Sequence, residues 1–225
     1  MKLLPLFPRF FNDDDNKVIG RVVTLGELES RLKACAKEKS PGPDGWTVEC
    51  FLGFWDLVGQ EVLNMVTESR QKGIVSGALN STFIALIPKK SKHLSFDDFR
   101  PISLCNLIYK IISKVIVERL KPFLENSITE ERFGFLPGRQ ILDVVELTQE
   151  GIHSIHSRNM LGVLLKMDLI KAYDRVDWDL IHFILIHIGL DGDLVLWIMA
   201  CVSNVQFSVL FNGLPTHFFH SHRGL

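Results

Sequence analysis

Apolar residues return every three or four positions in several parts of the chain, which is the spacing of one helix face. The broadest such stripe predicts the clearest helix, and Lys110, Lys114 and Lys121 share its opposite face. The stripe consists of Leu104, Leu107, Ile108, Ile111, Ile112, Val115, Ile116 and Leu120. The same period predicts helices over residues 47–72 and 141–157.

Two further signals concern the N-terminal part of the chain. Thr24 followed by Glu27 has the spacing of a capping box, so a helix is expected over Leu25–Lys37. Residues 1–20 combine prolines with an acidic cluster and are expected to form a linker or flexible tail.

Strand patterns occupy three other segments. Thr82–Ile87 is β-branched and aromatic, and Leu161–Leu169 is almost continuously apolar, as expected of a buried central strand. Val205–Phe211 runs into Asn212-Gly213, a pair typical of a hairpin turn. Helices that frame a few strands indicate an α+β fold.

Composition narrows the class of protein only slightly. The chain has 225 residues, 47% of them hydrophobic and 23% charged, which is ordinary for one substantial domain or two small ones. The net charge of −1 does not indicate nucleic-acid binding, but between Lys89 and Lys121 eight basic residues face three acidic ones. This basic face is either a solvated surface or a phosphate-binding one.

Cysteines and apolar runs argue for an intracellular protein without a membrane span. The four cysteines, Cys35, Cys50, Cys105 and Cys201, form no CxxC pair and are expected to be reduced thiols. The apolar stretch Leu180–Val202 is interrupted at residues 191–193, and neither half is long enough to cross a bilayer.

Five motifs in a fixed order carry most of the functional information. They are Ser40–Gly45, Leu86–Lys90, Phe99–Leu104, Gly134–Arg139 and the run from Leu164 to Trp178 that contains Asp168 and Tyr173. In this order and spacing they resemble a reverse transcriptase from a non-LTR (LINE-type) retrotransposon, the plant type especially. The resemblance covers about Ser40 to Leu225. It implies a right-hand polymerase with a fingers subdomain and an incomplete palm, without a thumb.

The last motif carries the acidic residue of the site. A carboxylate at the end of a buried strand can bind Mg²⁺, and two such ions activate a hydroxyl for nucleotide transfer. The resemblance implies that Asp168 holds the metal, that the backbone of Leu169 assists, and that Tyr173 excludes ribonucleotides by steric clash. Asp174 and Asp177 are interpreted as turn and helix-cap residues instead.

The second, third and fourth motifs supply basic residues. Lys89 at the tip of the strand and Arg100 on the returning segment match the family's triphosphate-binding pair, with Lys90 an equally plausible first member. Gly138 and Arg139 match template-side positions, as does the Ser40–Gly45 loop.

The resemblance also divides the chain and limits its expected activity. Residues 1–39 are expected to form an N-terminal linker or helical extension, residues 40–158 a fingers-like subdomain and residues 159–225 a partial palm. In the family, the segment after Leu225 carries an Asp-Asp pair. Because Asp168 alone does not hold two metal ions, we expect a truncated and inactive fragment.

The expected function is RNA-directed DNA polymerisation with an RNA template, a DNA primer, deoxynucleoside triphosphates and Mg²⁺, in the nucleus or cytoplasm. Two alternatives stay open: a non-catalytic module that binds RNA or an RNA–DNA hybrid, and an intact reading frame that continues beyond the printed sequence. A group II intron maturase fits the run Phe99–Lys114 less well.

Overall fold

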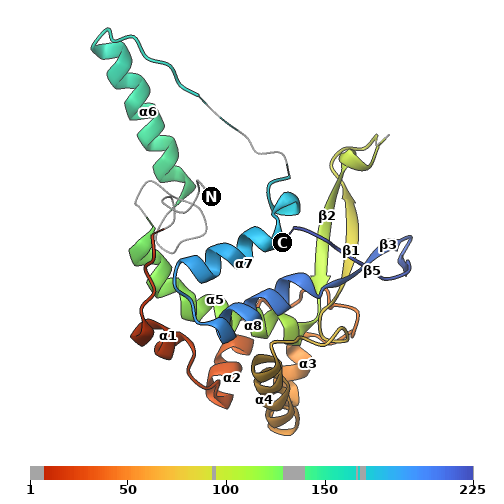
Figure 1. The fold of residues 1–225 in the computed structure, drawn as a ribbon. Helices are drawn as coiled ribbons and strands as arrows, with labels where there is room; N and C mark the ends of the chain where they lie inside the picture. The colour runs from red at the N-terminus through yellow and green to blue at the C-terminus, as the bar shows by residue number, and fades with distance from the viewer. Residues whose placement is uncertain (1–7, 93–94, 129–139, 166, 168–170, 225) are drawn as a thin grey trace. The chain divides into compact units, whose positions relative to one another are not determined.

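The computed structural model describes residues 8–92, 95–128, 140–165, 167 and 171–224 (Figure 1). The chain forms two compact units. The first comprises Met1–Arg119 and Tyr173–Leu225, and the second comprises Leu120–Ala172. The predicted division at residues 39 and 158 concerns functional subdomains and stays a prediction.

The sheet of the first unit has β1 (Ser81–Pro88) at its centre. β1 pairs in antiparallel fashion with β2 (Phe99–Cys105) and in parallel with β3 (Gln206–Phe211). The short strands β4 (Leu214–Pro215) and β5 (Phe219–His220) each pair with β3. The hairpin predicted at Asn212-Gly213 is confirmed, with φ of 50° and 81° at the two turn residues.

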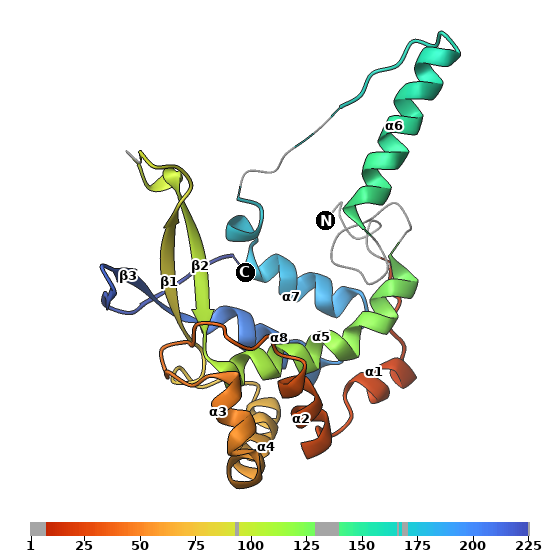
Figure 2. The same ribbon diagram turned by 180° about the vertical axis from the view of Figure 1, so that it is seen from behind.

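Eight α-helices are described, so the prediction of mixed helix and sheet holds (Figures 1 and 2). They are α1 (Asp13–Ile19), α2 (Leu25–Lys33), α3 (Val48–Gly53), α4 (Trp55–Lys72), α5 (Leu107–Ser127), α6 (Ile141–Ser157), α7 (Trp178–His187) and α8 (Gly192–Ser203). None of these helices, in the described parts of the chain, combines the length and apolarity needed to cross a membrane.

The core of the first unit forms where α5 meets the other helices. Ile111, Ile112 and Val115, on the predicted apolar stripe, are fully buried. α4 packs against α2 and α8, and the indole of Trp197 donates a 3.1 Å hydrogen bond to the hydroxyl of Ser69. The stripe therefore faces the core as its spacing predicted.

The expectation of a flexible tail over residues 1–20 is wrong for the described residues 8–20. They contain α1, which Asn12 caps by accepting from the backbone N–H groups of Asp14 and Asp15. Phe11 and Ile19 are buried. The acidic cluster suits the N-terminus of a helix because of the helix dipole, and buried apolar neighbours hold that helix in place.

The helix after Thr24 begins as predicted but ends four residues early, at Lys33. Thr24 accepts from the backbone N–H of Glu27, whereas the Glu27 carboxylate turns to Arg119 of α5 instead of completing a capping box. Ala34 caps the C-terminus, and its carbonyl accepts from the Lys114 ammonium. The Glu27 carboxylate and the Ala34 carbonyl thus bind side chains of α5, and the local interactions that the sequence predicted for them do not form.

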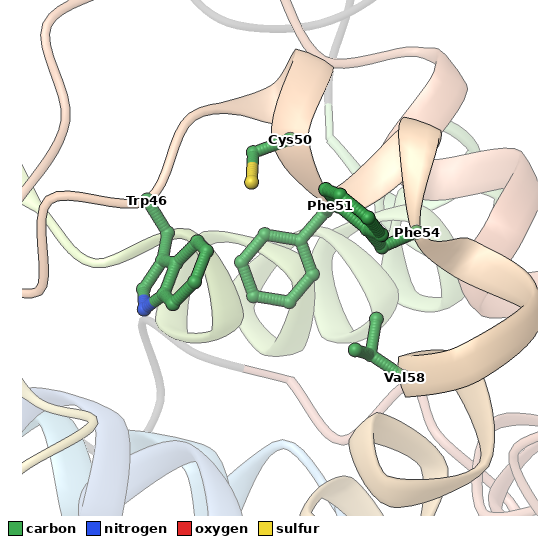
Figure 3. A pocket seen from close by; sticks show the side chains of 5 residues that line it. All are labelled: Trp46, Cys50, Phe51, Phe54 and Val58. Atoms are coloured by element: carbon green, nitrogen blue, oxygen red, sulfur yellow. The ribbon is translucent and has the colours of Figure 1, made fainter.

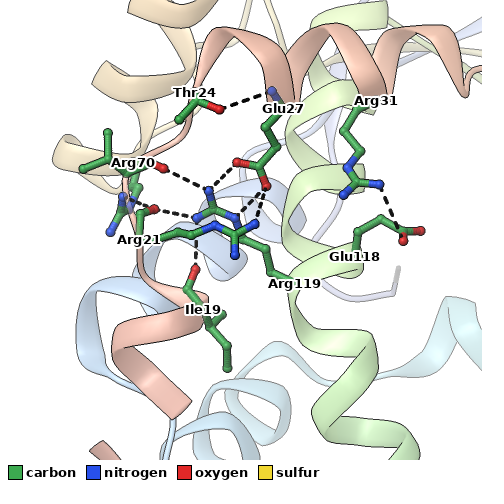
Figure 4. A network of polar contacts seen from close by, with 9 residues as sticks. Ile19, Arg21, Thr24, Glu27, Arg31, Arg70, Glu118 and Arg119 are labelled. Carbon is green, nitrogen blue, oxygen red and sulfur yellow. Dashed lines mark hydrogen bonds and ion pairs between the residues drawn. The ribbon is translucent and has the colours of Figure 1, made fainter. Parts of the chain in front are cut away.

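Arg119 is the centre of a buried polar cluster that joins the N-terminal segment to α5 (Figure 4). Its guanidinium contacts both carboxylate oxygens of Glu27 at 2.9 and 2.6 Å and donates to the carbonyls of Ile19, Arg21 and Val22. The two charged side chains are only 3% and 9% exposed. We call this group, Arg119 with Glu27 and the three carbonyls, the Arg119 clamp.

Two predicted helices have different boundaries in the structure. The helix expected over residues 47–72 is divided at Phe54 into α3 and α4, next to Gly53, a weak helix former. Leu104 was placed on the apolar stripe of a helix, but it lies in β2, where it pairs with Phe83. Ladder hydrogen bonds across a neighbouring strand outweighed the helical period there.

The buried strand expected over Leu161–Leu169 is not formed by its described residues. Residues 161–165 and 167 belong to no strand, and Leu161 and Val163 are almost completely exposed. A strand needs a partner for its backbone groups, and no described residue pairs with this run. Apolar composition alone therefore misled the prediction.

Candidate functional site

The β1–β2 hairpin brings two of the predicted phosphate-binding residues together. Ile87 lies opposite Arg100 in the register, and the N–H of Lys89 extends the ladder with a 2.8 Å hydrogen bond to the carbonyl of Asp98. Lys89 directly follows β1, so its backbone lies beside Asp98 and within two residues of Arg100 across the hairpin.

The hairpin tip contains an acidic turn that the sequence analysis did not single out. This turn is η2 (Phe96–Asp98), a 3-10 helix capped by Ser95. The ammonium of Lys89 donates to the backbone carbonyl of Asp97 at 2.7 Å. The ammonium of Lys90 forms an ion pair with the Asp98 carboxylate, also at 2.7 Å. The two lysines thus have chemically different partners.

The basic face predicted on α5 is partly covered. Lys110 and Lys114 are half-buried, and Lys114 donates to the carbonyl of Ala34 at 2.8 Å. The charge of Lys110 acts on the carboxylate of Asp44. These two lysines therefore lie neither on a fully solvated surface nor in an open phosphate-binding groove. The exposed basic residues of this stretch are instead at the hairpin.

The Ser40–Gly45 loop is fixed to the junction of β2 and α5 by Asn106. This buried amide accepts from the N–H of Asp44 at 3.1 Å and donates to the carbonyl of Ala78 at 2.8 Å. A Cβ on Gly42 would lie 2.4 Å from the Asn106 side chain, so glycine is required for the close approach. Burial raises the pKa of the Asp44 carboxyl, although the backbone N–H of Trp46 and the charge of Lys110 oppose the shift.

An apolar pocket of about 270 Å³ lies beside this loop (Figure 3). Its lining consists of Trp46, Cys50, Phe51, Phe54 and Val58. The rings of Trp46 and Phe51 meet edge to face, with centroids 6.2 Å apart. Since its lining is apolar and mostly aromatic, the pocket is suited to an apolar group rather than to phosphate.

Tyr173, the predicted steric-gate residue, begins η3 (Tyr173–Arg175) and is 55% exposed. Its neighbour Asp174 and the C-terminal Arg223 line a cavity of about 570 Å³ together with residues of β1, β2 and α8. Asp177 caps α7 by accepting from two backbone N–H groups, so its predicted cap role is confirmed.

Two hydrogen bonds tie the C-terminal segment to the chain after Tyr173. The indole of Trp178 donates to the carbonyl of Gly224 at 2.7 Å, and the N–H of Gly224 donates to the carbonyl of Val176 at 2.8 Å. Gly224 has a φ of 91°, a conformation that favours glycine. The sequence analysis did not identify Trp178 as a contact of this segment.

The Tyr109 phenol and the Cys201 thiol lie close together, and burial keeps both in their neutral forms at neutral pH. The Tyr109 hydroxyl donates to the carbonyl of Cys201 at 3.2 Å. Burial raises the pKa of Tyr109 to about 12 and that of Cys201 to about 12. All four cysteines carry free thiols, as the sequence analysis expected.

Four predicted site residues lie outside the described residues: Asp168, Leu169, Gly138 and Arg139. Within the described ranges, no group of three or more His, Cys, Asp or Glu side chains is placed to hold a metal ion. The structure therefore brings Lys89, Lys90 and Arg100 together and leaves the acidic and template-side parts of the predicted site untested.

Comparison with known proteins identifies the family. Residues 87–223 match the family model described as reverse transcriptase (RNA-dependent DNA polymerase), which is more than half of the chain. The chain belongs to the reverse transcriptase family. The match begins at the end of β1 and includes the whole tip of the hairpin with Lys89, Lys90 and Arg100.

Two curated relatives come from mobile elements. The Transposon TX1 uncharacterized 149 kDa protein of Xenopus laevis is 36% identical over 155 residues, which is 69% of this chain and 12% of that protein. The Retrovirus-related Pol polyprotein from type-1 retrotransposable element R1 of Bradysia coprophila is 20% identical over 157 residues, 68% of this chain and 15% of that protein. This chain thus spans a small part of either relative's length.

Proposed function

We propose that this chain is the fingers and partial palm of an RNA-directed DNA polymerase from a non-LTR, LINE-type retrotransposon of the plant kind. Its partners are an RNA template, a DNA primer and deoxynucleoside triphosphates, inside the nucleus or cytoplasm. The observation that supports the proposal most directly is the β1–β2 pairing, since the backbone of Lys89 lies within two residues of Arg100 across one hairpin. Membership of the reverse transcriptase family supports it.

The hairpin cations are assigned to the incoming triphosphate. Arg100 offers a planar fork that suits two phosphate oxygens, and a lysine offers a mobile point charge. Tyr173 is assigned to excluding the ribose 2′-oxygen, and Gly138 with Arg139 to the template strand. These last three assignments rest on the resemblance to the family.

Magnesium is assigned to Asp168, with the backbone of Leu169 beside it, on the same grounds. When bound, the metal would stabilise charge on the transferred phosphate. Among the described residues, Asp177 is engaged as a helix cap, and no three acidic, imidazole or thiol groups converge on one point. No step is therefore derived through the metal.

Binding of nucleic acid tests the proposal directly. A labelled RNA–DNA hybrid titrated at increasing salt should show an affinity that falls steeply, because each phosphate contact releases counterions. Arg139→Ala, at the position assigned to the template strand, should reduce the salt dependence, whereas Asp56→Asn on the exposed side of α4 should not. Weak binding that is indifferent to salt would contradict a phosphate-directed surface.

Primer extension separates catalysis from binding. In the printed sequence, Asp168 is the one residue that matches the family's acidic ligands, so these 225 residues alone should not extend a primer on an RNA template. Hybrid binding without extension would favour the non-catalytic binding module. Extension that is abolished by Asp168→Ala would show that the residues present suffice.

A further inference from the structure

The apolar pocket beside the Ser40–Gly45 loop is formed by rings that differ in exposure (Figure 3). Trp46 is 53% exposed and Phe54 is 56% exposed, whereas Phe51, which lies between them, is 9% exposed. Cys50 and Val58 complete the lining of this cavity of about 270 Å³, and we call the five residues the Trp46 pocket. Aromatic rings that line one pocket and stay half in water mark a candidate binding site.

Hydrogen bonds fix the position of Trp46 before any ligand binds. Its backbone N–H donates to the Asp44 carboxylate at 3.1 Å, and the N–H of Asp44 donates to the buried side chain of Asn106. On the other side of Trp46, Thr47 caps the N-terminus of α3. The indole also meets Phe51 edge to face, which restricts its rotation. A ring held in this way loses little conformational entropy when a ligand binds.

The indole N–H of Trp46 is available to a ligand. The indoles of Trp178 and Trp197 donate to protein groups, whereas that of Trp46 makes no hydrogen bond to any residue that the structure describes. In Figure 3 its nitrogen lies on the side of the ring away from Phe51. The pocket therefore combines an apolar aromatic surface with a donor at its rim. A nucleobase matches both features, because its faces stack on aromatic rings and its edge carries hydrogen-bond acceptors, whereas an alkyl chain has no acceptor.

Two exposed lysines lie on the segment that leads to the loop. Lys37 and Lys39 flank Glu38, whose backbone N–H donates to the Glu49 carboxylate of α3 at 2.8 Å. That hydrogen bond and, to a smaller extent, the charge of Lys37 lower the pKa of the Glu49 carboxyl. The lysine segment is thus tied to the helix that carries Phe51. Aromatic rings beside cationic side chains are the combination with which proteins bind single-stranded nucleic acid.

We propose that the Trp46 pocket binds one unpaired base of a single-stranded RNA, which stacks on the exposed face of Trp46, while Lys37 and Lys39 contact the adjoining phosphates. This inference rests on the proposed function, which supplies an RNA template, and deepens it with a contact for one template base. The Ser40–Gly45 loop then serves to hold Trp46 in place, because Gly42 allows its close approach to Asn106.

Binding of a short, labelled oligoadenylate RNA, measured by fluorescence anisotropy, tests the inference. The reference ligand is an abasic oligomer of the same length, which carries the same phosphates without the bases, and the wild type should bind it more weakly than the RNA. Trp46→Leu should weaken RNA binding about fivefold to a hundredfold, the usual effect of losing one base–aromatic stack, and should leave binding of the abasic oligomer unchanged. Trp46→Phe, which keeps an aromatic ring, should retain most of the affinity.

Intrinsic tryptophan fluorescence reports the same contact by a second route. Trp55 and Trp197 are buried, so a base that stacks on Trp46 should quench the emission of the exposed indole, and Trp46→Leu should remove that quenching. Phe211→Leu is the matched control, because it replaces an aromatic ring that is 68% exposed and lies outside the pocket. It should leave affinity and quenching unchanged. Urea unfolding of each variant should confirm that it is folded.

The inference fails, and the proposed function stands, if the RNA binds no more tightly than the abasic oligomer or if Trp46→Leu binds RNA as tightly as the wild type. An equal loss of affinity for both oligomers in Trp46→Leu would also overturn it, since the residue would then be structural. Self-association of the wild type that Trp46→Leu abolishes would instead make the pocket an interface between two copies. A wild-type chain that binds no RNA would overturn the inference and the proposed function together.

Discussion

The Arg119 clamp and the β1–β2 hairpin use the same residue types from one basic stretch of the chain in opposite ways. Arg119 is 3% exposed, and its donors go to a carboxylate and three backbone carbonyls. Lys89 and Arg100 are exposed on a hairpin, and Lys90 is largely so. A count of basic residues in the sequence does not distinguish the buried side chain from the exposed ones.

The difference teaches which cations are available for a ligand. A buried guanidinium with satisfied donors cannot change partners without a large desolvation penalty, so Arg119 is structural. For exposed lysines, the free-energy cost of exchanging one partner for another is small. Partners and burial, rather than local charge density, therefore indicate which basic side chains are accessible to a ligand.

The largest expected effect is on the clamp. Arg119→Ala would remove the closest cation from the buried Glu27 carboxylate, which also pairs with Arg21 at 3.6 Å, and would take the donor from the carbonyls of Ile19 and Val22. It should reduce the free energy of unfolding by about 3–5 kcal/mol. Urea denaturation measures it. Lys92→Ala, which removes an exposed charge, should change stability by no more than about 0.5 kcal/mol. Equal effects for the two variants would refute a structural role for Arg119.

Acid should weaken the clamp. Burial of Glu27 opposes its ionisation, but the hydrogen bonds and charge of Arg119, with the charges of Arg21 and Arg31, outweigh this and lower its pKa below the ordinary 4.5. The stabilisation is therefore complete above that value and lost as pH falls through the folded-state pKa. The stability gap between wild type and Glu27→Gln should narrow below about pH 4.5; an unchanged gap would contradict the shift.

Substitution in the hairpin should lower the affinity for a ligand and leave the free energy of unfolding nearly unchanged, the reverse of substitution in the clamp. Arg100→Ala should lower the affinity for dTTP about tenfold, because a bidentate phosphate contact is lost. Its free energy of unfolding should change by less than about 1 kcal/mol, since the residue is exposed on a strand. Arg100→Lys should recover only part of the affinity. A stability loss as large as that of Arg119→Ala would make Arg100 structural as well.

The smallest effect concerns the ion pair at the tip. A double-mutant cycle of Lys90→Ala and Asp98→Asn, followed by urea unfolding, should give a coupling energy below about 1 kcal/mol, since the Lys90 side chain is 60% exposed although that of Asp98 is 16% exposed. A coupling of several kcal/mol would place this pair in the same class as the clamp and remove the contrast between the two regions.

Local sequence patterns predicted several elements well, because each of these elements depends on a few residues that are close in the sequence. The apolar stripe of α5, the cap at Thr24, the cap at Asp177 and the turn at Asn212-Gly213 each depend on side chains near in sequence. The hairpin pair could be anticipated because Lys89 and Arg100 are joined by one short connection. The resemblance to reverse transcriptases came from motif order and was confirmed by the family match.

What could not be anticipated depends on partners far away in the chain. Asn106 accepts a hydrogen bond from the Ser40–Gly45 loop. Asn12 caps the N-terminus of α1, which the buried side chains of Phe11 and Ile19 hold in place. Leu161 and Val163 are exposed although their pattern indicated a buried strand. A strand and a buried charge both need a partner that brings complementary groups, and no local pattern identifies that partner.

Short-range propensity and motif order were thus enough to name the family and to predict that Lys89 and Arg100 lie on one hairpin. Only the tertiary structure distinguishes Arg119, which is buried in an ion pair, from Lys89, which is exposed and bound to a backbone carbonyl. The physical reason is that desolvation and pairing are properties of surroundings assembled from segments distant in the chain, whereas capping, turns and helical stripes are properties of neighbouring residues.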